Sequence, residues 1–269
     1  TVTVLDVSGN KVDDSTAGIT ASVSPAGALL SGSLSGSAIA GQRVFTGLKL
    51  TGTVGSYTIT YESTGLTSTS SAVTLTFGAV DHITLVASST ATNAVAFGTQ
   101  PVATIYDADN NTVYNASNVI ELSSTDVTLS GTLTTTAITG TYSWSSYPVA
   151  TGTAGTRSVT ATIQGTNISV TQTFTLSAGV ATQLALVTPA AGAVNRVAFT
   201  TQPVVQLQDS AGNNVAAVSY TVSFASSAGA TAAGASTQTD ANGRATFTNA
   251  SLYGAVGSYT LTFSCSSLT

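Results

Sequence analysis

The residues best suited to bind a cation lie in the segment "DADNN", which begins at Asp107. Asp107, Asp109 and Asn111 have the 1-3-5 spacing of oxygen ligands in a calcium loop. Such a loop also needs Gly at position six and Glu at position twelve, where this chain has Thr112 and Asn118. The pattern therefore favours a structural turn over a calcium site at these three residues. We expect no cofactor.

The single histidine could in principle serve acid–base chemistry. His82 follows Asp81, and serines are abundant in the chain. A hydrolytic triad needs an exposed nucleophile, and no Gly-x-Ser-x-Gly turn accompanies this histidine. One histidine in 269 residues leaves little scope for catalysis, so we expect no enzyme activity. Asp81 is the only carboxylate that we place at a seam between repeats.

Covalent modification has four candidate sites. Each begins an Asn-x-Ser/Thr sequence, the acceptor motif for N-glycosylation: Asn110, Asn115, Asn167 and Asn249. In a chain this rich in Ser and Thr, chance alone supplies several such motifs. They remain candidates only.

The composition excludes several classes of partner. Charged residues make up 6% of the chain, against roughly 25% in an ordinary soluble domain. With a net charge of −5 and six basic residues, the chain lacks the electrostatic footprint of a nucleic-acid binder. It also lacks a run of about 18 apolar residues, so we expect no direct insertion into a membrane. Low charge offers little repulsion between copies and favours self-association.

The elements that carry these residues repeat along the chain. "AFGTQPVATIYDADNNTV" begins at Ala96, and "AFTTQPVVQLQDSAGNNV" begins at Ala198. Three aspartates share one position of this repeat, spaced by 101 and then 102 residues: Asp6, Asp107 and Asp209. The asparagines four residues later share another: Asn10, Asn111 and Asn213. The chain therefore holds three copies of one module, and this repeat is its strongest signal.

Each module reads as a set of short strands. Apolar and polar residues alternate in segments such as "GSYTLTF", and turn residues recur every 8–12 positions, as in a Greek-key β-sandwich of immunoglobulin type. In the Asp-x-x-x-Asn turn, Gly9, Asn110 and Gly212 are expected to supply the left-handed residue. Tyr57 and Tyr259 fit the tyrosine corner of such folds, while Arg157 takes their place in the second module.

The segment "ATQLALV…AFTTQPVVQLQDSAGNNV…TDANGRATFTNASLYGAVGSYTLTFSCSSLT" resembles the tandem bacterial immunoglobulin-like repeats of the invasin and intimin type. It is similar also to the "TTQP…V-x-D-x-x-G-N" arrays of very large bacterial surface proteins. The resemblance covers the whole chain. It implies an extracellular, cell-surface location and a role as stalk, filament or lattice unit.

We therefore predict an all-β chain of three tandem immunoglobulin-like Greek-key β-sandwiches that form a rod. The boundaries lie at 1–78, 79–179 and 180–269. Aligned with the complete second module, the first lacks the first strands and the third lacks the last strand. We expect the native polypeptide to continue beyond both Thr1 and Thr269.

Two functions from different classes follow. The first is a structural segment of an extracellular repeat protein (filament, surface layer or adhesin stalk) that acts by spacing and self-assembly with further repeats or copies. The second is an adhesive module that recognises host protein or glycan through loops of the second repeat, such as "TYSWSSYPVATGTAGTR".

Overall fold

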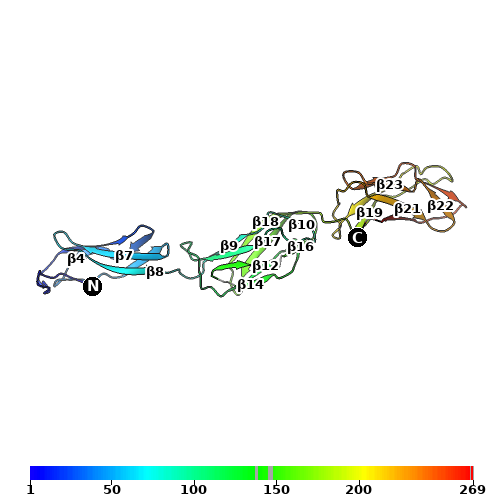
Figure 1. The fold of residues 1–269 in the computed structure, drawn as a ribbon. Helices are drawn as coiled ribbons and strands as arrows, with labels where there is room; N and C mark the ends of the chain where they lie inside the picture. Colours follow the sequence, from blue (N-terminus) through cyan, green and yellow to red (C-terminus); the bar gives the residue numbers. More distant parts are fainter. Residues whose placement is uncertain (137–138, 145–147, 267, 269) are drawn as a thin grey trace. The chain divides into compact units, whose positions relative to one another are not determined.

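The computed structural model describes residues 1–136, 139–144, 148–266 and 268 of the chain. Every regular element within these residues is a β-strand (Figure 1). The expected all-β fold class is confirmed. The described part of the chain contains no helix long and apolar enough to cross a membrane.

The first repeat forms a four-stranded sheet, a two-stranded sheet and a two-stranded ribbon. Its strands are β1 (Val2–Thr3), β2 (Gly18–Ser24), β3 (Ala28–Ser31), β4 (Ser35–Ser37), β5 (Gln42–Arg43), β6 (Lys49–Gly52), β7 (Gly55–Glu62) and β8 (Thr69–Leu75). One sheet has the order β4-β2-β7-β8, and the second pairs β1 with β5. The ribbon pairs β3 with β6.

The described residues of the second repeat form ten strands. They are β9 (His82–Val86), β10 (Thr90–Thr92), β11 (Val102–Tyr106), β12 (Val119–Ser123), β13 (Thr128–Ser130), β14 (Thr134–Thr136), β15 (Thr141–Ser143), β16 (Val149–Thr151), β17 (Gly155–Ile163) and β18 (Ser169–Ser177). They form sheets of order β10-β18-β17-β12-β14 and β15-β11-β9, with the ribbon β13-β16.

The third repeat follows the same plan. Its strands are β19 (Gln183–Thr188), β20 (Val204–Gln208), β21 (Thr221–Ser226), β22 (Ala230–Ala233), β23 (Ser236–Gln238), β24 (Arg244–Thr246), β25 (Ser251–Gly254) and β26 (Leu261–Cys265). The sheets have the orders β19-β20-β24 and β23-β21-β26, with the ribbon β22-β25.

Packing in the third repeat shows why two sheets form. Val205 on β20 and Phe224 on β21 belong to one buried cluster, so the inner faces of both sheets close on each other. Phe247 packs against both Phe224 and Phe263, with ring centroids 5.4 and 5.8 Å away. Alternate residues of each strand point to one face, which makes the period-2 pattern of the sequence the pattern of this core.

Residue contacts divide the chain into two compact units. Unit 1 comprises Thr1–Thr84, Thr104–Asn118 and Ala137–Tyr142, and unit 2 comprises Leu85–Ala103, Val119–Thr136 and Ser143–Thr269. The predicted seam after Gly78 therefore lies inside unit 1, and the seam after Gly179 lies inside unit 2. The division into domains 1–78, 79–179 and 180–269 stays a prediction.

The turns adopt the predicted backbone. Gly9, Asn110 and Gly212 have φ angles of 83°, 62° and 81°, so all three supply the left-handed residue. Asn tolerates this region better than other residues with a β-carbon, which explains its presence in the second turn.

The tyrosine corner is conserved in geometry even where tyrosine is replaced. The hydroxyl of Tyr57 donates to the Thr53 carbonyl at 2.7 Å, and Tyr259 makes the same bond to Ala255 at 2.7 Å. In the second repeat, Nε of Arg157 donates to the carbonyl of Thr153 at 2.7 Å. The guanidinium thus reaches the same backbone position with a different donor.

Candidate junction site

The Asp-x-x-x-Asn turns are closed by one carboxylate oxygen. Oδ1 of Asp107 accepts hydrogen bonds from the backbone N–H groups of Asp109 and Asn111, at 3.0 and 2.8 Å. Asp6 and Asp209 make the equivalent pairs at 2.8 to 2.9 Å. Because an aspartate carboxylate satisfies two N–H donors of the turn, each turn holds its shape from local residues alone.

The second oxygen of two of these carboxylates binds the seam. Oδ2 of Asp107 accepts a hydrogen bond from the backbone N–H of Gly78 at 2.8 Å. Oδ2 of Asp209 accepts one from Gly179 at 2.9 Å. We expected Asp81 to be the only seam carboxylate, and that expectation is wrong. The turn aspartates reach the seam because Gly78 and Gly179 lie within hydrogen-bond distance of their second carboxylate oxygen.

The turn asparagines bridge to the turn that precedes β7 or β17 in the preceding repeat. Oδ1 of Asn111 accepts from the N–H of Val54, and its Nδ2 donates to the carbonyl of Gly52, both at 2.9 Å. Asn213 makes the same pair of bonds with Ala154 and Gly152, at 2.6 and 2.9 Å. A carboxamide offers a donor and an acceptor side by side, so it pairs with a backbone turn as a neighbouring strand would.

One further side chain joins the second set. Asn93 accepts a hydrogen bond from the Gly152 N–H through Oδ1 and donates to Oδ2 of Asp209 through Nδ2, each at 2.9 Å. Its counterpart in the third repeat, Asn195, accepts from the Gly254 N–H at 3.2 Å and is exposed. The hydrogen bond from a glycine N–H to this asparagine is therefore present in both repeats. It lies beside Asp209 in the second repeat and is exposed to solvent in the third.

We name these two sets by their members. Junction 1 consists of Gly52, Val54, Gly78, Asp107 and Asn111, all in unit 1. Junction 2 consists of Asn93, Gly152, Ala154, Gly179, Asp209 and Asn213, all in unit 2.

Burial distinguishes the junction turns from the first turn. Asp107 and Asp209 are 4% and 1% exposed, and Asn111 and Asn213 are 6% and 7% exposed. Asp6 and Asn10, with the same sequence motif, are exposed. The same local turn is thus buried only where a preceding repeat covers it.

Hydrogen bonding sets the charge state of the junction carboxylates. Burial alone raises the pKa of Asp107, but the N–H groups of Gly78 and Asn111 outweigh it and hold this pKa below its usual value. The pKa of Asp209 is likewise lowered, because donors from Asn213, Gly179 and Asn93 outweigh the effect of burial. Both aspartates are therefore ionised acceptors at neutral pH.

The donors leave little of the candidate calcium site free. Both oxygens of Asp107 already accept from N–H groups, and the amide of Asn111 is turned to Gly52 and Val54. Asp109 is exposed and shares only its backbone N–H with this arrangement. In the described residues, no three His, Cys, Asp or Glu side chains gather as a metal site would require. Asp107 and Asn111, which have the spacing of calcium ligands, form a hydrogen-bonded junction here.

The remaining candidate residues lie apart from the junctions or do not take part in them. All four candidate glycosylation asparagines are exposed: Asn110, Asn115, Asn167 and Asn249. His82 stacks on Tyr106 with ring centroids 5.3 Å apart, and its Nδ1 lies 3.1 Å from Oδ2 of Asp81. The loop sequence suggested for adhesive binding includes residues 145–147, which lie outside the described residues.

Sequence reasoning missed Asn93, Asn195 and the glycines that face the turns. A signal was present, because Asn93 and Asn195 occupy one position of the repeat, 102 residues apart. Their partners could not be read from that spacing, since Asp209 lies 116 residues from Asn93.

A family model decides the class of part of the chain. The model described as "SMCHD1 Ig-like domain 6" matches residues 179–268. The third repeat is an immunoglobulin-like domain. Together with the shared strand plan, this match confirms the immunoglobulin-like resemblance found in the sequence. No match to the chain is found among curated proteins.

Several solved structures are similar at low identity. Invasin, described as a bacterial integrin-binding protein, is 19% identical over 99% of this chain and 53% of its own, with a TM-score of 0.37. The adhesin FdeC of Escherichia coli is 16% identical over 97% and 85%, with a TM-score of 0.40. Domains 4–9 of the surface layer protein SbsC are 17% identical over 100% and 40%, with a TM-score of 0.28. The chain thus spans about half the length of the invasin chain.

Proposed function

We propose that this chain is a structural segment of an extracellular repeat protein, in which junctions 1 and 2 couple consecutive repeats and keep their spacing under load. The observation that carries the proposal is the recurrence of one buried bridge. Asn111 and Asn213 each satisfy a backbone N–H and a backbone carbonyl of the preceding repeat. The proposal includes no catalytic step.

The junctions suit a load-bearing role for a physical reason. Pulling Asn213 away from Gly152 and Ala154 would leave buried donors and acceptors without partners, at a cost of about 1–3 kcal/mol for each group that stays buried. The Asp209 carboxylate raises that cost, since it holds the Asn213 amide at 2.9 Å and accepts from Gly179 as well. Bending between repeats would therefore have to break these directional hydrogen bonds.

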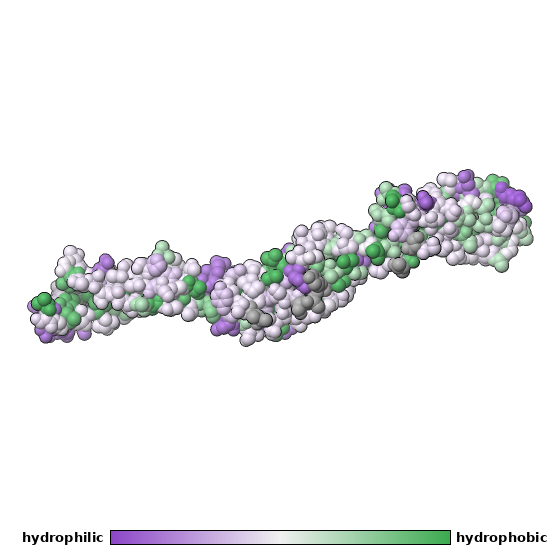
Figure 2. Space-filling model, viewed as in Figure 1, coloured by the Kyte–Doolittle hydropathy of each residue, from purple (hydrophilic) through white to green (hydrophobic). Residues whose placement is uncertain are grey.

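Surface composition supports the extracellular location and the assembly. The visible face of the protein is mostly near neutral in hydropathy, with strongly hydrophilic colour confined to small patches (Figure 2). Only six lysines and arginines are present in 269 residues. Faces with so few charges repel one another weakly, so lateral contact between copies is favoured over dispersion.

Two exposed turns carry complementary halves of a junction. Asp6 and Asn10 form an exposed turn of the kind that receives a preceding repeat in junctions 1 and 2. Gly254 and Asn195 are exposed counterparts of Gly152 and Asn93. We therefore propose that Asn10 can meet the counterpart of Gly254 in a further repeat or in another copy of the chain.

The coupling is tested by paired substitutions. Asn213→Ala and Asn111→Ala should each lower the calorimetric melting temperature by several degrees and broaden the distance distribution seen by X-ray scattering. Asn10→Ala removes the same side chain from an exposed turn and should change neither measurement. If all three variants match the parent chain, the coupling role is wrong.

Location and assembly need separate measurements. Antibodies against this chain should label intact cells of the source organism without permeabilisation, and labelling only after lysis would contradict an extracellular role. Sedimentation velocity of concentrated protein should show reversible end-to-end species. These species should be reduced by Asn10→Ala and unaffected by Asn115→Ala, an exposed asparagine away from either end.

A further inference from the structure

We propose that an aromatic–acidic cluster beside junction 1 binds an arginine side chain of a basic protein segment. The cluster consists of Phe77, Asp81, His82, Tyr106 and Tyr114, all in unit 1. A guanidinium would stack on the rings of the cluster and pair with the carboxylate of Asp81. The proposal is independent of the proposed structural role.

The four rings of the cluster form two pairs. His82 stacks on Tyr106, with an interplanar angle of 17° and ring centroids 5.3 Å apart. Phe77 meets Tyr114 edge to face, with ring centroids 6.4 Å apart. Each pair therefore joins a residue on the seam side of the junction to a residue of the hairpin that carries the Asp107 turn.

This hairpin presents both tyrosines on one face. Tyr106 forms a β-bridge with Thr112. The adjacent residues Ile105 and Val113 are both buried, and Val113 donates its N–H to the Ile105 carbonyl at 3.0 Å. Because side chains alternate between faces, Tyr106 and Tyr114 share the opposite, outer face. They are diagonal neighbours across the two strands, a separation of about 7–8 Å that aromatic side chains can span.

The cluster is accessible, and its carboxylate is available to a cation. Tyr114 is 57% exposed, and the side chains of Asp81 and His82 are 55% and 38% exposed. The N–H of Asp81 donates to the Tyr106 carbonyl at 2.9 Å, which holds the carboxylate beside the stacked pair. Within the described residues, His82 is the one side chain in ion-pair distance of Asp81, so no lysine or arginine neutralises it.

The charge of this part of the chain favours a cationic partner. No lysine or arginine occurs between Lys49 and Arg157. The same stretch contains six carboxylates: Glu62, Asp81, Asp107, Asp109, Glu121 and Asp126. Outside it, acidic and basic residues nearly balance, so the negative charge of the chain is concentrated in the stretch that includes the cluster. Carboxylates without basic neighbours attract a positively charged partner and disfavour an acidic one.

Arginine matches the cluster in shape as well as in charge. Its guanidinium is planar, stacks on aromatic rings and pairs with a carboxylate through two N–H groups. A ring attracts a cation that lies within about 6 Å of its centroid. Asp81 directly precedes His82, so one guanidinium can reach the carboxylate and a ring at the same time.

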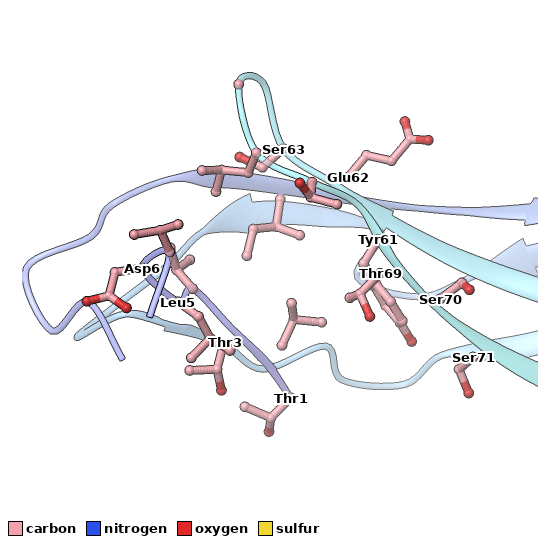
Figure 3. Close-up of a pocket in the computed structure, with 17 residues that line it drawn as sticks. Thr1, Thr3, Leu5, Asp6, Tyr61, Glu62, Ser63, Thr69, Ser70 and Ser71 are labelled. Carbon is pink, nitrogen blue, oxygen red and sulfur yellow. The ribbon is translucent and has the colours of Figure 1, made fainter. Parts of the chain in front are cut away.

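The rings are not needed to form a junction. At junction 2, non-aromatic residues occupy the four ring positions: Ala178, Gln183, Gln208 and Ala216. In the first repeat, Leu5 takes the position of Tyr106, beside Asp6 (Figure 3). Junction 2 nevertheless makes the same asparagine bridge as junction 1. We therefore attribute the rings of junction 1 to recognition of a partner.

The test is an NMR titration of the isotope-labelled full chain with the synthetic peptide Gly-Arg-Gly-Arg-Gly. The backbone amide signals of Gly78, His82 and Tyr114 should shift saturably, with a Kd on the order of 1 mM at low salt, the range expected for one stacked ion pair. Salt at about 0.5 M should weaken binding severalfold, because it screens exposed charges. Absence of saturable shifts up to about 10 mM peptide would overturn the proposal.

Residues that the chain already uses at junction 2 test the rings. Tyr106→Gln and Tyr114→Ala copy Gln208 and Ala216, which stand in a folded junction, so both variants should fold. Each should weaken peptide binding about two- to fivefold, because it removes a ring that the guanidinium would contact. Unchanged binding by both variants would refute the aromatic contact.

A matched pair tests the carboxylate. Asp81→Asn should weaken binding about two- to fivefold. Glu121→Gln removes an exposed carboxylate of the same basic-free stretch from β12 and should leave binding unchanged. Equal weakening by the two variants would show that general charge attracts the peptide and would refute the site.

Two other probes test the chemistry of the ligand. The peptide Gly-Lys-Gly-Lys-Gly should bind more weakly than the arginine peptide, since an ammonium group neither stacks nor pairs through two N–H groups. Equal binding of the two peptides would contradict the stacked arrangement. Cellohexaose, a neutral oligosaccharide, should leave the signals in place. Saturable shifts with cellohexaose and none with the arginine peptide would identify a sugar site and overturn the proposal.

Discussion

The side chain of Asn93 donates a hydrogen bond of 2.9 Å to the carboxylate of Asp209, which lies 116 residues further along the chain, and both side chains are buried. The bond joins the segment after β10 of the second repeat to the turn after β20 of the third. Because Asp209 also accepts from Gly179 and Asn213, its negative charge is met entirely by N–H groups.

This hydrogen bond predicts that two substitutions at equivalent positions of the repeat have unequal effects on stability. Asn93→Ala should lower the free energy of unfolding of unit 2 by about 1–3 kcal/mol, because it leaves a buried carboxylate short of one donor. Asn195→Ala removes the repeat counterpart from an exposed position and should change stability by less than about 0.5 kcal/mol. Scanning calorimetry of both variants measures the difference, and equal losses would contradict the junction.

The junction aspartates predict a loss of stability in acid. The folded-state pKa values of Asp107 and Asp209 are lowered below the ordinary value of an aspartate, because N–H donors outweigh the effect of burial. Their contribution is therefore fully present above the unfolded-state pKa and is lost as the pH falls through the lower folded-state value. The melting temperature should fall steeply below about pH 4.

A charge-matched pair tests this assignment. Asp209→Asn should lower the melting temperature near neutral pH and flatten its decline in acid, because the titrating group is gone. Asp109→Asn removes the same charge from an exposed turn position and should leave the acid decline as steep as in the parent chain. Parallel pH curves for the parent chain and Asp209→Asn would count against the junction carboxylate.

The tyrosine corner predicts that removal of a single hydroxyl group lowers the stability of the fold. Tyr57 is 6% exposed, and its hydroxyl donates to Thr53 at 2.7 Å. Tyr57→Phe should cost about 1 kcal/mol or slightly more, since it leaves a partly buried carbonyl unpaired while keeping the ring. Tyr114→Phe, at a tyrosine that is 57% exposed, is the control and should be neutral. Thermal unfolding that is unchanged by Tyr57→Phe would exclude a stabilising corner.

The turns also predict indifference to calcium. Asp107 already accepts N–H donors at both carboxylate oxygens, so a cation would have to displace them. Millimolar calcium should leave the melting temperature unchanged, whereas binding to the folded state would raise it. A rise of several degrees that Asp109→Ala abolishes would show a calcium site at Asp107, Asp109 and Asn111 instead.

The sequence by itself determined the features that depend on local geometry. Period-2 alternation fixed the strands, because a strand turns successive side chains to opposite faces. The left-handed residues at Gly9, Asn110 and Gly212 could be predicted, because few residues tolerate that backbone region. The alignment of repeats carried these predictions from one copy to the next, so the all-β class was predicted correctly.

Tertiary structure alone decided which copy of a motif does what. The Asp-x-x-x-Asn turns are alike in sequence at Asp6 and Asp107, and local bonds close both in the same way. Only Asp107 is buried and receives Gly78, and only Asn111 reaches Gly52, 59 residues away. The corner at Arg157 could not be predicted either. Nothing in the residue type indicates that a guanidinium will form the hydrogen bond that a tyrosine hydroxyl forms in the other repeats. A hydrogen bond depends on which groups meet at about 3 Å after the chain has folded, and residue spacing along the sequence does not encode that meeting.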